Sequence, residues 1–305
     1  MISFTQEQSL WGSLSDDASS TSKALGAILC NEKRREILSS RRWRFLEKTK
    51  TLSTVASQQA YDLPSDLAWL SNVTVTISST RYTPKEIKSR EEWDILNQST
   101  SVTSDTPEYF FLTNSTIEFY PIPSSSTSNA ITFKYGRKQK DLSIADYTTG
   151  GILTMVNGSS TVVGTGTTFT ESMVGRWLRI TESDTANKGD GEWYEIAGYT
   201  SATAITLDLL YNGTAITAGN AAYTIGQMPL LPEPYQMLPL YAGLVIYFTS
   251  VKPDQVKSKL YNDLYVNTFA QMESSESGKS SNPVLNPGIY EKMPVNPNNY
   301  PPAVS

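Results

Sequence analysis

The sequence of 305 residues contains no histidine and a single cysteine, Cys30. Without histidine, the chain lacks the commonest general base, the commonest metal ligand and every nucleophile pair that depends on an imidazole. A lone cysteine cannot form a disulfide within the chain, and no charged segment followed by an apolar core opens the sequence, so we expect synthesis in a reducing cytoplasm. These absences exclude much familiar catalysis, and we predict a protein that is not an enzyme and uses no cofactor or metal.

Strong net charge and long hydrophobic runs are also lacking. Lys and Arg number 25 and Asp and Glu number 30, so the net charge of -5 gives no global field for nucleic acid or acidic membranes. The longest apolar run, residues 237–248, has 12 residues and includes Pro239 and Gly243, well short of the ~20 needed to cross a bilayer. We therefore expect no membrane contact, and any contact with nucleic acid must come from a local patch.

What is present predicts an α+β fold, in which a helical frame is interrupted by β structure. Apolar residues at steps of three and four predict a first helix over about residues 18–42. A helix over residues 85–97 is predicted to open after Pro84, with Ile87, Trp93 and Ile95 facing a core. Alternating apolar and polar residues predict a small antiparallel sheet, with strands near residues 48–55, 70–78, 108–112, 116–120 and 131–135.

Residues 148–227 have a different sequence pattern, in which turns containing glycine recur every 8 to 20 residues between short β-type runs. This pattern is typical of a sandwich or small barrel. Pro232 and Pro234 then open a helix through residue 250 that is apolar almost all round. A second helix starts at Pro253 and completes a hairpin. Its predicted apolar stripe consists of Val256, Leu260, Leu264, Tyr265 and Phe269.

The predicted division has four parts: a frame of helix and small sheet over residues 1–147, an inserted β-module over 148–227, a helical hairpin over 228–272 that completes the frame, and an extended arm over 273–305. The arm is rich in Pro, Asn and Ser, which prevents regular structure. Its apolar residues Tyr290, Met293 and Tyr300 are candidate anchors on a partner. The alternative is a loose chain end.

Four motifs occur in order along the chain. They are Arg42-Trp-Arg-Phe-Leu46, Tyr61-Asp-Leu-Pro64 with Asp66, Tyr120-Pro-Ile-Pro123 and Leu231-Pro-Glu-Pro-Tyr235. In this order they resemble the head-to-tail adaptor, or head completion, proteins of short-tailed bacteriophages, over roughly residues 15–145 and 228–272. The segments 163–170, 173–177 and 192–194 are similar to a β-module of several phage structural proteins.

The resemblance implies a structural virion protein at the head-tail junction, made in the cytoplasm of a bacterial host. Such proteins form a homo-oligomeric ring, here of about twelve subunits, beneath the portal protein. The ring extends the DNA channel, helps retain packaged DNA and offers a surface to tail or nozzle proteins. The alternative function is a carbohydrate-binding or receptor-binding tail protein with its site on the β-module. The insertion departs from smaller members of the family, so its contacts do not follow from the resemblance.

One stretch near the end of the first helix is strongly basic. It contains eight basic residues against Glu32, Glu36 and Glu47. In a ring it could face an acidic portal surface or the phosphates of channel DNA, and salt would then weaken the contact. The alternative is a solvated helix end. The candidate residues are Lys33, Arg34, Arg35, Arg41, Arg42, Arg44, Lys48 and Lys50.

Two other features have a structural and a functional interpretation. Trp43 and Phe45 could be interface anchors, but we favour a role in the core of the bundle. The polar loop around Gly189 and Gly191 resembles a calcium loop in composition, but its spacing does not fit the EF-hand pattern, which favours a hairpin. The loop residues concerned are Asp184, Asn187, Asp190 and Glu192.

Overall fold

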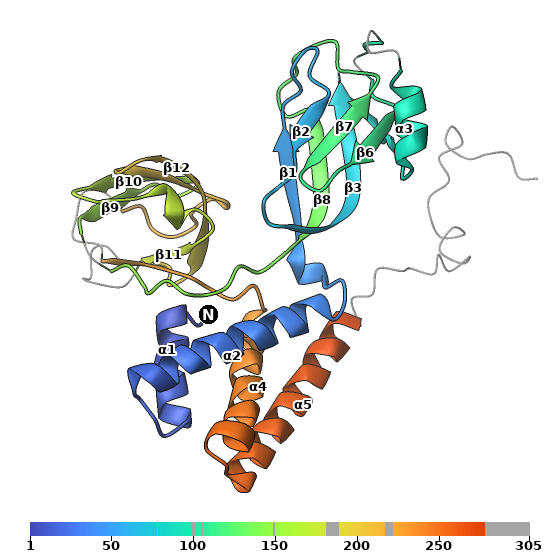
Figure 1. Cartoon of the computed structure of the whole chain (residues 1–305). Helices are drawn as coiled ribbons and strands as arrows, with labels where there is room; N and C mark the ends of the chain where they lie inside the picture. The colour runs from blue at the N-terminus through green and yellow to red at the C-terminus, as the bar shows by residue number, and fades with distance from the viewer. Residues whose placement is uncertain are drawn as a thin grey trace, which may run out of the picture.

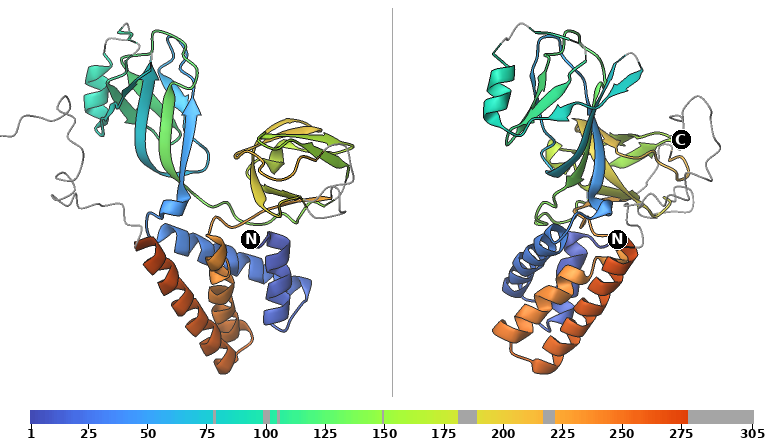
Figure 2. Two further views of the ribbon diagram at one scale, coloured as in Figure 1. Left: turned by 180° about the vertical axis from the view of Figure 1, so that it is seen from behind. Right: turned by 90° about the vertical axis from the view of Figure 1, so that its right-hand side faces the viewer.

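The computed structural model describes residues 1–77, 79–98, 102–104, 106–148, 150–180, 189–216 and 222–277. Its three parts are a helical frame (residues 4–39 and 233–277), a first β unit (residues 44–137) and a second β unit (residues 152–226), as Figure 1 shows. Both β units lie at the same end of the helical frame, in all the views of Figures 1 and 2. The predicted α+β fold is confirmed.

In the described chain, the helical frame contains α1 (Phe4–Leu14), α2 (Ser20–Ser39), α4 (Leu238–Ile246) and α5 (Gln255–Ser277). The central helix α4 packs against both α2 and α5, and α1 lies against α2 and α4. A 3-10 turn, η3 (Glu233–Tyr235), precedes α4, and a π-helical segment, η4 (Tyr247–Val251), connects it to α5.

The first helix, α1, is absent from the sequence prediction, although its start carries a capping box. The Ser3 hydroxyl accepts a hydrogen bond from the Gln6 N–H, and the Gln6 side chain accepts one from the Ser3 N–H. The buried Trp11 holds α1 against α2, where it contacts Gly26 and donates from Nε1 to the Ser22 hydroxyl at 3.1 Å. A Cβ atom at Gly26 would lie 2.3 Å from a Trp11 ring atom, so the close approach of the helices requires glycine.

The first β unit contains two four-stranded sheets, with strand orders β1-β8-β3-β4 and β2-β7-β6-β5. Their inner faces bury Val75, Ile117, Phe119 and Phe133 in one core. A 3-10 turn, η1 (Arg44–Leu46), leads from α2 into β1, and α3 (Arg90–Leu96) lies beside the second sheet. The strands are β1 (Glu47–Leu52), β2 (Ala60–Asp62), β3 (Leu67–Ile77), β4 (Thr80–Tyr82), β5 (Lys85–Glu86), β6 (Tyr109–Leu112), β7 (Thr116–Tyr120) and β8 (Ile131–Arg137).

The helix predicted directly after Pro84 begins later than expected. Residues 85–86 form β5, which pairs in parallel with β6, and the helix starts at Arg90 because Ser89 caps its N-terminus. Trp93 is buried, as predicted. The prediction for Ile95 is wrong, because its side chain is 66% exposed on the outer side of this short helix.

The second β unit is one curled sheet with strand order β14-β11-β12-β13-β10-β9 (Figure 1). Its concave side buries Leu153, Val162, Leu178, Ile205 and Ile225. Bulges in β12 help the sheet to curl. The elements are β9 (Ile152–Met155), β10 (Thr161–Thr165), η2 (Glu171–Met173), β11 (Trp177–Ile180), β12 (Trp193–Ser201), β13 (Ala204–Leu207) and β14 (Tyr223–Gly226).

The predicted stripe on α5 is only partly correct. Val256, Leu260 and Leu264 are 81%, 53% and 37% exposed, so their predicted burial is wrong. The buried row lies on a neighbouring face of the helix and includes Tyr261 and Met272. Tyr261 stacks on Phe248, with ring centroids 5.8 Å apart. These three apolar side chains therefore lie on the surface of α5.

Candidate functional site

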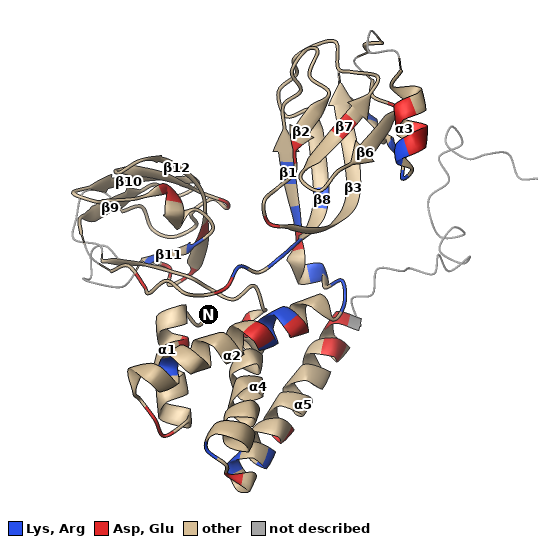
Figure 3. Cartoon of the chain, viewed as in Figure 1, with Lys and Arg blue, Asp and Glu red and all other residues tan. Residues whose placement is uncertain are grey.

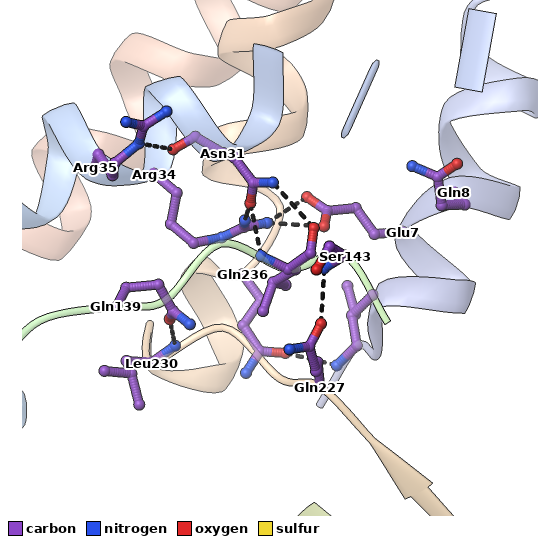
Figure 4. Close-up of polar contacts among 12 residues, drawn as sticks. Glu7, Gln8, Asn31, Arg34, Arg35, Gln139, Ser143, Gln227, Leu230 and Gln236 are labelled. Atoms are coloured by element: carbon purple, nitrogen blue, oxygen red, sulfur yellow. Dashed lines mark hydrogen bonds and ion pairs between the residues drawn. The ribbon is translucent and has the colours of Figure 1, made fainter. Parts of the chain in front are cut away.

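The two segments that connect the second β unit to the rest of the chain lie side by side against the helical frame. Tyr147, before β9, exchanges two backbone hydrogen bonds of 2.9 Å with Ile225 in β14, which brings the end of one segment next to the start of the other. Figure 4 shows the polar contacts that join the two segments, α1 and α2. We call this cluster the polar junction, defined by Glu7, Asn31, Arg34, Gln139 and Gln227.

A buried ion pair forms the centre of the polar junction. Arg34 Nη2 lies 2.6 Å from Oε1 and 2.7 Å from Oε2 of Glu7, and their side chains are only 1% and 10% exposed. Arg34 also donates from Nη1 to Asn31, one helical turn away on the same face of α2. Because both charges are shielded from water, each depends on the other for compensation.

Asn31 and two glutamines bind the connecting segments. The Asn31 side chain donates to the Leu142 carbonyl at 2.9 Å and accepts from the Leu142 N–H at 3.0 Å. The Gln227 side-chain oxygen accepts from the Ser143 N–H at 2.7 Å, and that of Gln139 accepts from the Leu230 N–H at 2.5 Å. These contacts satisfy backbone groups that have no strand partner, and they fix the segment before β9 to α2 and the two segments to each other.

A second polar contact joins the two β units directly. Glu195, on β12 of the second β unit, accepts from Lys48 Nζ at 3.0 Å and from Arg137 Nη1 at 2.7 Å, both in the first β unit. All three side chains are mostly buried. One carboxylate therefore holds two strands of the neighbouring sheet by charge-assisted hydrogen bonds.

The structure changes the predicted basic patch. The inclusion of Arg34 is wrong, because its side chain is buried against Glu7 instead of facing a partner. Several of the other members form ion pairs within the chain, which reduces the charge they present. These pairs are Lys33 with Glu36, Arg35 with Asp141, Arg41 with Glu273, and Lys48 with Glu195 and Asp208.

Arg42, Arg44 and Lys50 remain exposed. Arg42 lies over the Trp69 ring at 5.2 Å, and Arg44 and Lys50 form no ion pair with any residue that the structure describes. The pairing of Glu47 with Gly136 brings the exposed Lys138 and Lys140 to the same end of the sheet, a proximity that sequence reasoning missed. Figure 3 shows basic residues gathered where the first β unit meets the helical frame. We call Arg42, Arg44, Lys50, Lys138 and Lys140 the basic belt.

Trp43 belongs to the core, as we favoured. It is buried, and its Nε1 donates to the Ile37 carbonyl at 2.9 Å.

In the described part of the polar loop, Asp190 accepts hydrogen bonds from the Tyr194 hydroxyl and from the Glu192 N–H. Asp184 and Asn187 lie outside the described residues. Among the residues that are described, no three acidic, Cys or His side chains are grouped to hold a metal ion.

Two titratable groups have pKa values raised by burial. Burial, together with the hydrogen bond to Asp190, raises the pKa of Tyr194 to about 12. Burial in the helical frame also raises the pKa of the Cys30 thiol well above its usual value, so the thiol stays protonated and is a poor nucleophile.

No helix in the described ranges has the length and apolar character of a membrane span. The arm anchors Tyr290, Met293 and Tyr300 lie outside the described residues.

Comparison with known families relates this architecture to phage assembly. Residues 7–157 match the model of the SU10 adaptor protein family, a range that contains most of α1, all of α2 and the whole first β unit. A search of the curated proteins gave no match. The chain is therefore a member of the SU10 adaptor family, a phage head-tail adaptor protein and a structural component of the virion.

Proposed function

We propose that copies of this protein form a ring beneath the portal, which joins the phage head to the tail, extends the DNA channel and helps retain packaged DNA. The observation that carries the proposal is the family match, because it covers the part of the helical frame and the first β unit that surround the polar junction. The proposed ring has about twelve copies, in keeping with the cyclic symmetry usual in homo-oligomers.

We propose that residues 148–227 are an insertion between two halves of the frame, residues 1–147 and 228–272. The side-by-side connecting segments support this division, because a module whose two ends are adjacent can be added without separating the helices. Its position at the end of the helical frame that also carries the first β unit makes it available to the portal or to tail proteins (Figure 1).

The basic belt is the proposed contact for acidic portal surface or channel DNA. Arg44 and Lys50 are exposed and unpaired among the described residues, and a ring repeats them in every copy. Repeated like charges around a channel attract phosphates over a distance that salt shortens to about 10 Å at 0.1 M. The predicted start of the arm at residue 273 is wrong, because residues 273–277 still belong to α5, where Glu273 pairs with Arg41. We propose that the rest of the arm, to residue 305, binds the portal or a neighbouring subunit.

Mass measurement of the purified chain, alone and with purified portal, tests this proposal. We expect a discrete ring in the presence of portal, and weaker association when salt is raised. A variant with Arg42→Gln and Arg44→Gln should bind less tightly and lose part of its salt dependence, since each lost phosphate contact lowers the logarithmic slope by about 0.9. The matched control is Arg81→Gln with Lys85→Gln, two exposed residues elsewhere in the first β unit. A lasting monomer without portal affinity would contradict the proposal.

A further inference from the structure

The surface of α5 carries a line of exposed apolar side chains. Val256, Leu260 and Leu264 are spaced by four residues and lie along one flank of the helix. With a rise of 1.5 Å per residue, the line is about 12 Å long. We call these three residues the apolar ridge.

A groove of similar length runs along α1. It has a volume of about 520 Å³, and one wall is the row Thr5, Ser9 and Ser13, whose small side chains leave space. The residues that line it carry no charged side chain. They are Met1, Ile2, Thr5, Gln6, Ser9, Leu10 and Ser13. We call it the α1 groove.

The helix that lines the groove, α1, and the helix that carries the ridge, α5, lie on opposite sides of the helical frame in Figures 1 and 2. The two helices run in opposite directions, because α1 ends where α5 begins. The Tyr261 hydroxyl donates to the Leu14 carbonyl at 3.3 Å, and Lys257 pairs with Asp16. One subunit thus offers two different apolar surfaces, one at each side.

We propose that the apolar ridge of one copy packs into the α1 groove of the next copy. This inference rests on the proposed ring, and it names the surfaces that build it. A head-to-tail interface between identical subunits requires two different patches, and a ring results when the rotation closes. Rows spaced by four residues on both helices allow the commonest class of helix packing, in which the ridge of one helix fills the groove of the other.

Charge favours the same pairing of surfaces. A rotation about an axis parallel to the helices keeps their directions, so α5 of one copy lies antiparallel to α1 of the next. Asp16 pairs with Lys257 of its own copy, so Asp17 at the end of α1 is the acid that then faces the basic start of α5 in the next copy. Residues 1–22 contain no Lys or Arg, whereas residues 252–259 contain Lys252, Lys257 and Lys259 against a single Asp254. Lys259 is exposed and forms no ion pair with any described residue.

Cysteine cross-linking tests the pairing directly, because the natural Cys30 is buried. The variant Ser9→Cys with Leu260→Cys should give a ladder of covalent multimers when the ring, assembled with portal if required, is oxidised. The matched control combines Ser9→Cys with Asn262→Cys, which places an exposed thiol on the opposite flank of α5, and it should stay monomeric under denaturing conditions. Each single-cysteine variant, oxidised in the same way, measures the background of cross-links that form by chance collision.

Charge insertion gives an independent measurement. Leu260→Asp should weaken association between copies ~30-fold or more, because an unpaired carboxylate would be buried in the interface. Val266→Asp is the matched control, since Val266 is 52% exposed against 53% for Leu260 but lies on the other flank of α5. We expect it to assemble like the natural protein, and helical circular dichroism should be unchanged in both variants.

The outcomes separate this inference from the proposed function. A normal ring that gives no ladder and tolerates Leu260→Asp overturns the interface but leaves the ring. If Leu260→Asp preserves the ring and removes portal binding, the ridge is a portal contact and the interface is again overturned. Absence of any ring in the natural protein, with or without portal, overturns the proposed function itself.

Discussion

Replacing Arg34 by methionine should destabilise the helical frame far more than removing an exposed ion pair from the same helix. Methionine retains much of the apolar volume but leaves the Glu7 carboxylate, only 10% exposed, without the Nη2 group that now lies within 2.7 Å of both its oxygens. Removing one partner of a buried pair costs about 3–5 kcal/mol. This is a large part of the ~5–15 kcal/mol that stabilises a folded protein.

The double variant Glu7→Gln with Arg34→Met should recover part of this loss, because no unpaired charge is then buried. Urea unfolding followed by circular dichroism at the helical band measures both effects. The control is Lys33→Met, since Lys33 pairs with the largely exposed Glu36 and its loss should cost about 0–1 kcal/mol. A cost below about 1 kcal/mol for Arg34→Met, or a double variant that loses the sum of both single effects, would refute the reasoning.

The same substitution should also loosen the connecting segment before β9. Arg34 holds Asn31, and Asn31 bonds both the N–H and the carbonyl of Leu142. Hydrogen exchange should therefore become faster at residues 138–147 in the Arg34→Met variant, while exchange in β6 and β7 stays unchanged. Uniformly faster exchange would indicate global destabilisation without this local link.

Three further predictions concern other contacts. Gly26→Ala should lower the free energy of unfolding by about 1–3 kcal/mol in thermal melts, although alanine favours helix, because its Cβ would meet the Trp11 ring. Glu195→Gln should weaken the contact between the β units and increase the radius of gyration in X-ray scattering, with unchanged circular dichroism. Because burial raises the pKa of Tyr194 to about 12, the neutral phenol contributes its full stability below pH ~10 and loses it toward pH 12. Tyr194→Phe should therefore flatten the alkaline decline of the unfolding midpoint.

Each of these predictions has a control and a result that contradicts it. Ala24→Gly, at an exposed position of α2, is the control that measures the effect of helix propensity alone. A Gly26→Ala variant more stable than the natural protein would exclude the steric argument. Glu192→Gln alters an exposed acid near β12, so an equal increase in radius of gyration would dismiss the role of Glu195. For Tyr194→Phe, an alkaline decline as steep as that of the natural protein would assign it to other groups.

The strands and the long helix α2 were predictable from sequence because their signals are local. Strands β6 and β7 occupy the predicted ranges, since alternation and an intervening turn define a hairpin without reference to distant residues. The helix after Pro84 was misplaced because Ser89 is the stronger N-cap, and because residues 85–86 find a strand partner in β6. Such a partner is a tertiary contact, which no local pattern contains.

The polar junction was not predictable for the same reason. Arg34 appeared as one of several basic residues, and its partner Glu7 lies on a helix that the prediction omitted. One signal was available, because Glu7 precedes Trp11 by four residues and so shares its face of a helix. A carboxylate on an apolar face requires a buried partner. The sequence could therefore indicate that a cation is needed, but only the packing of α1 on α2 selects Arg34.

The arrangement of these contacts constrains how the second β unit behaves in the proposed ring. A module attached by two flexible connections would point in a different direction in each copy. Here Asn31 fixes the first connecting segment to α2, the Gln227 carbonyl accepts from the Phe4 N–H at the start of α1, and Glu195 fixes β12 to the first β unit. Because these contacts reach the module from two sides, they resist rotation about the connections. Every copy in the ring should then present its second β unit in the same direction, as a regular docking surface requires.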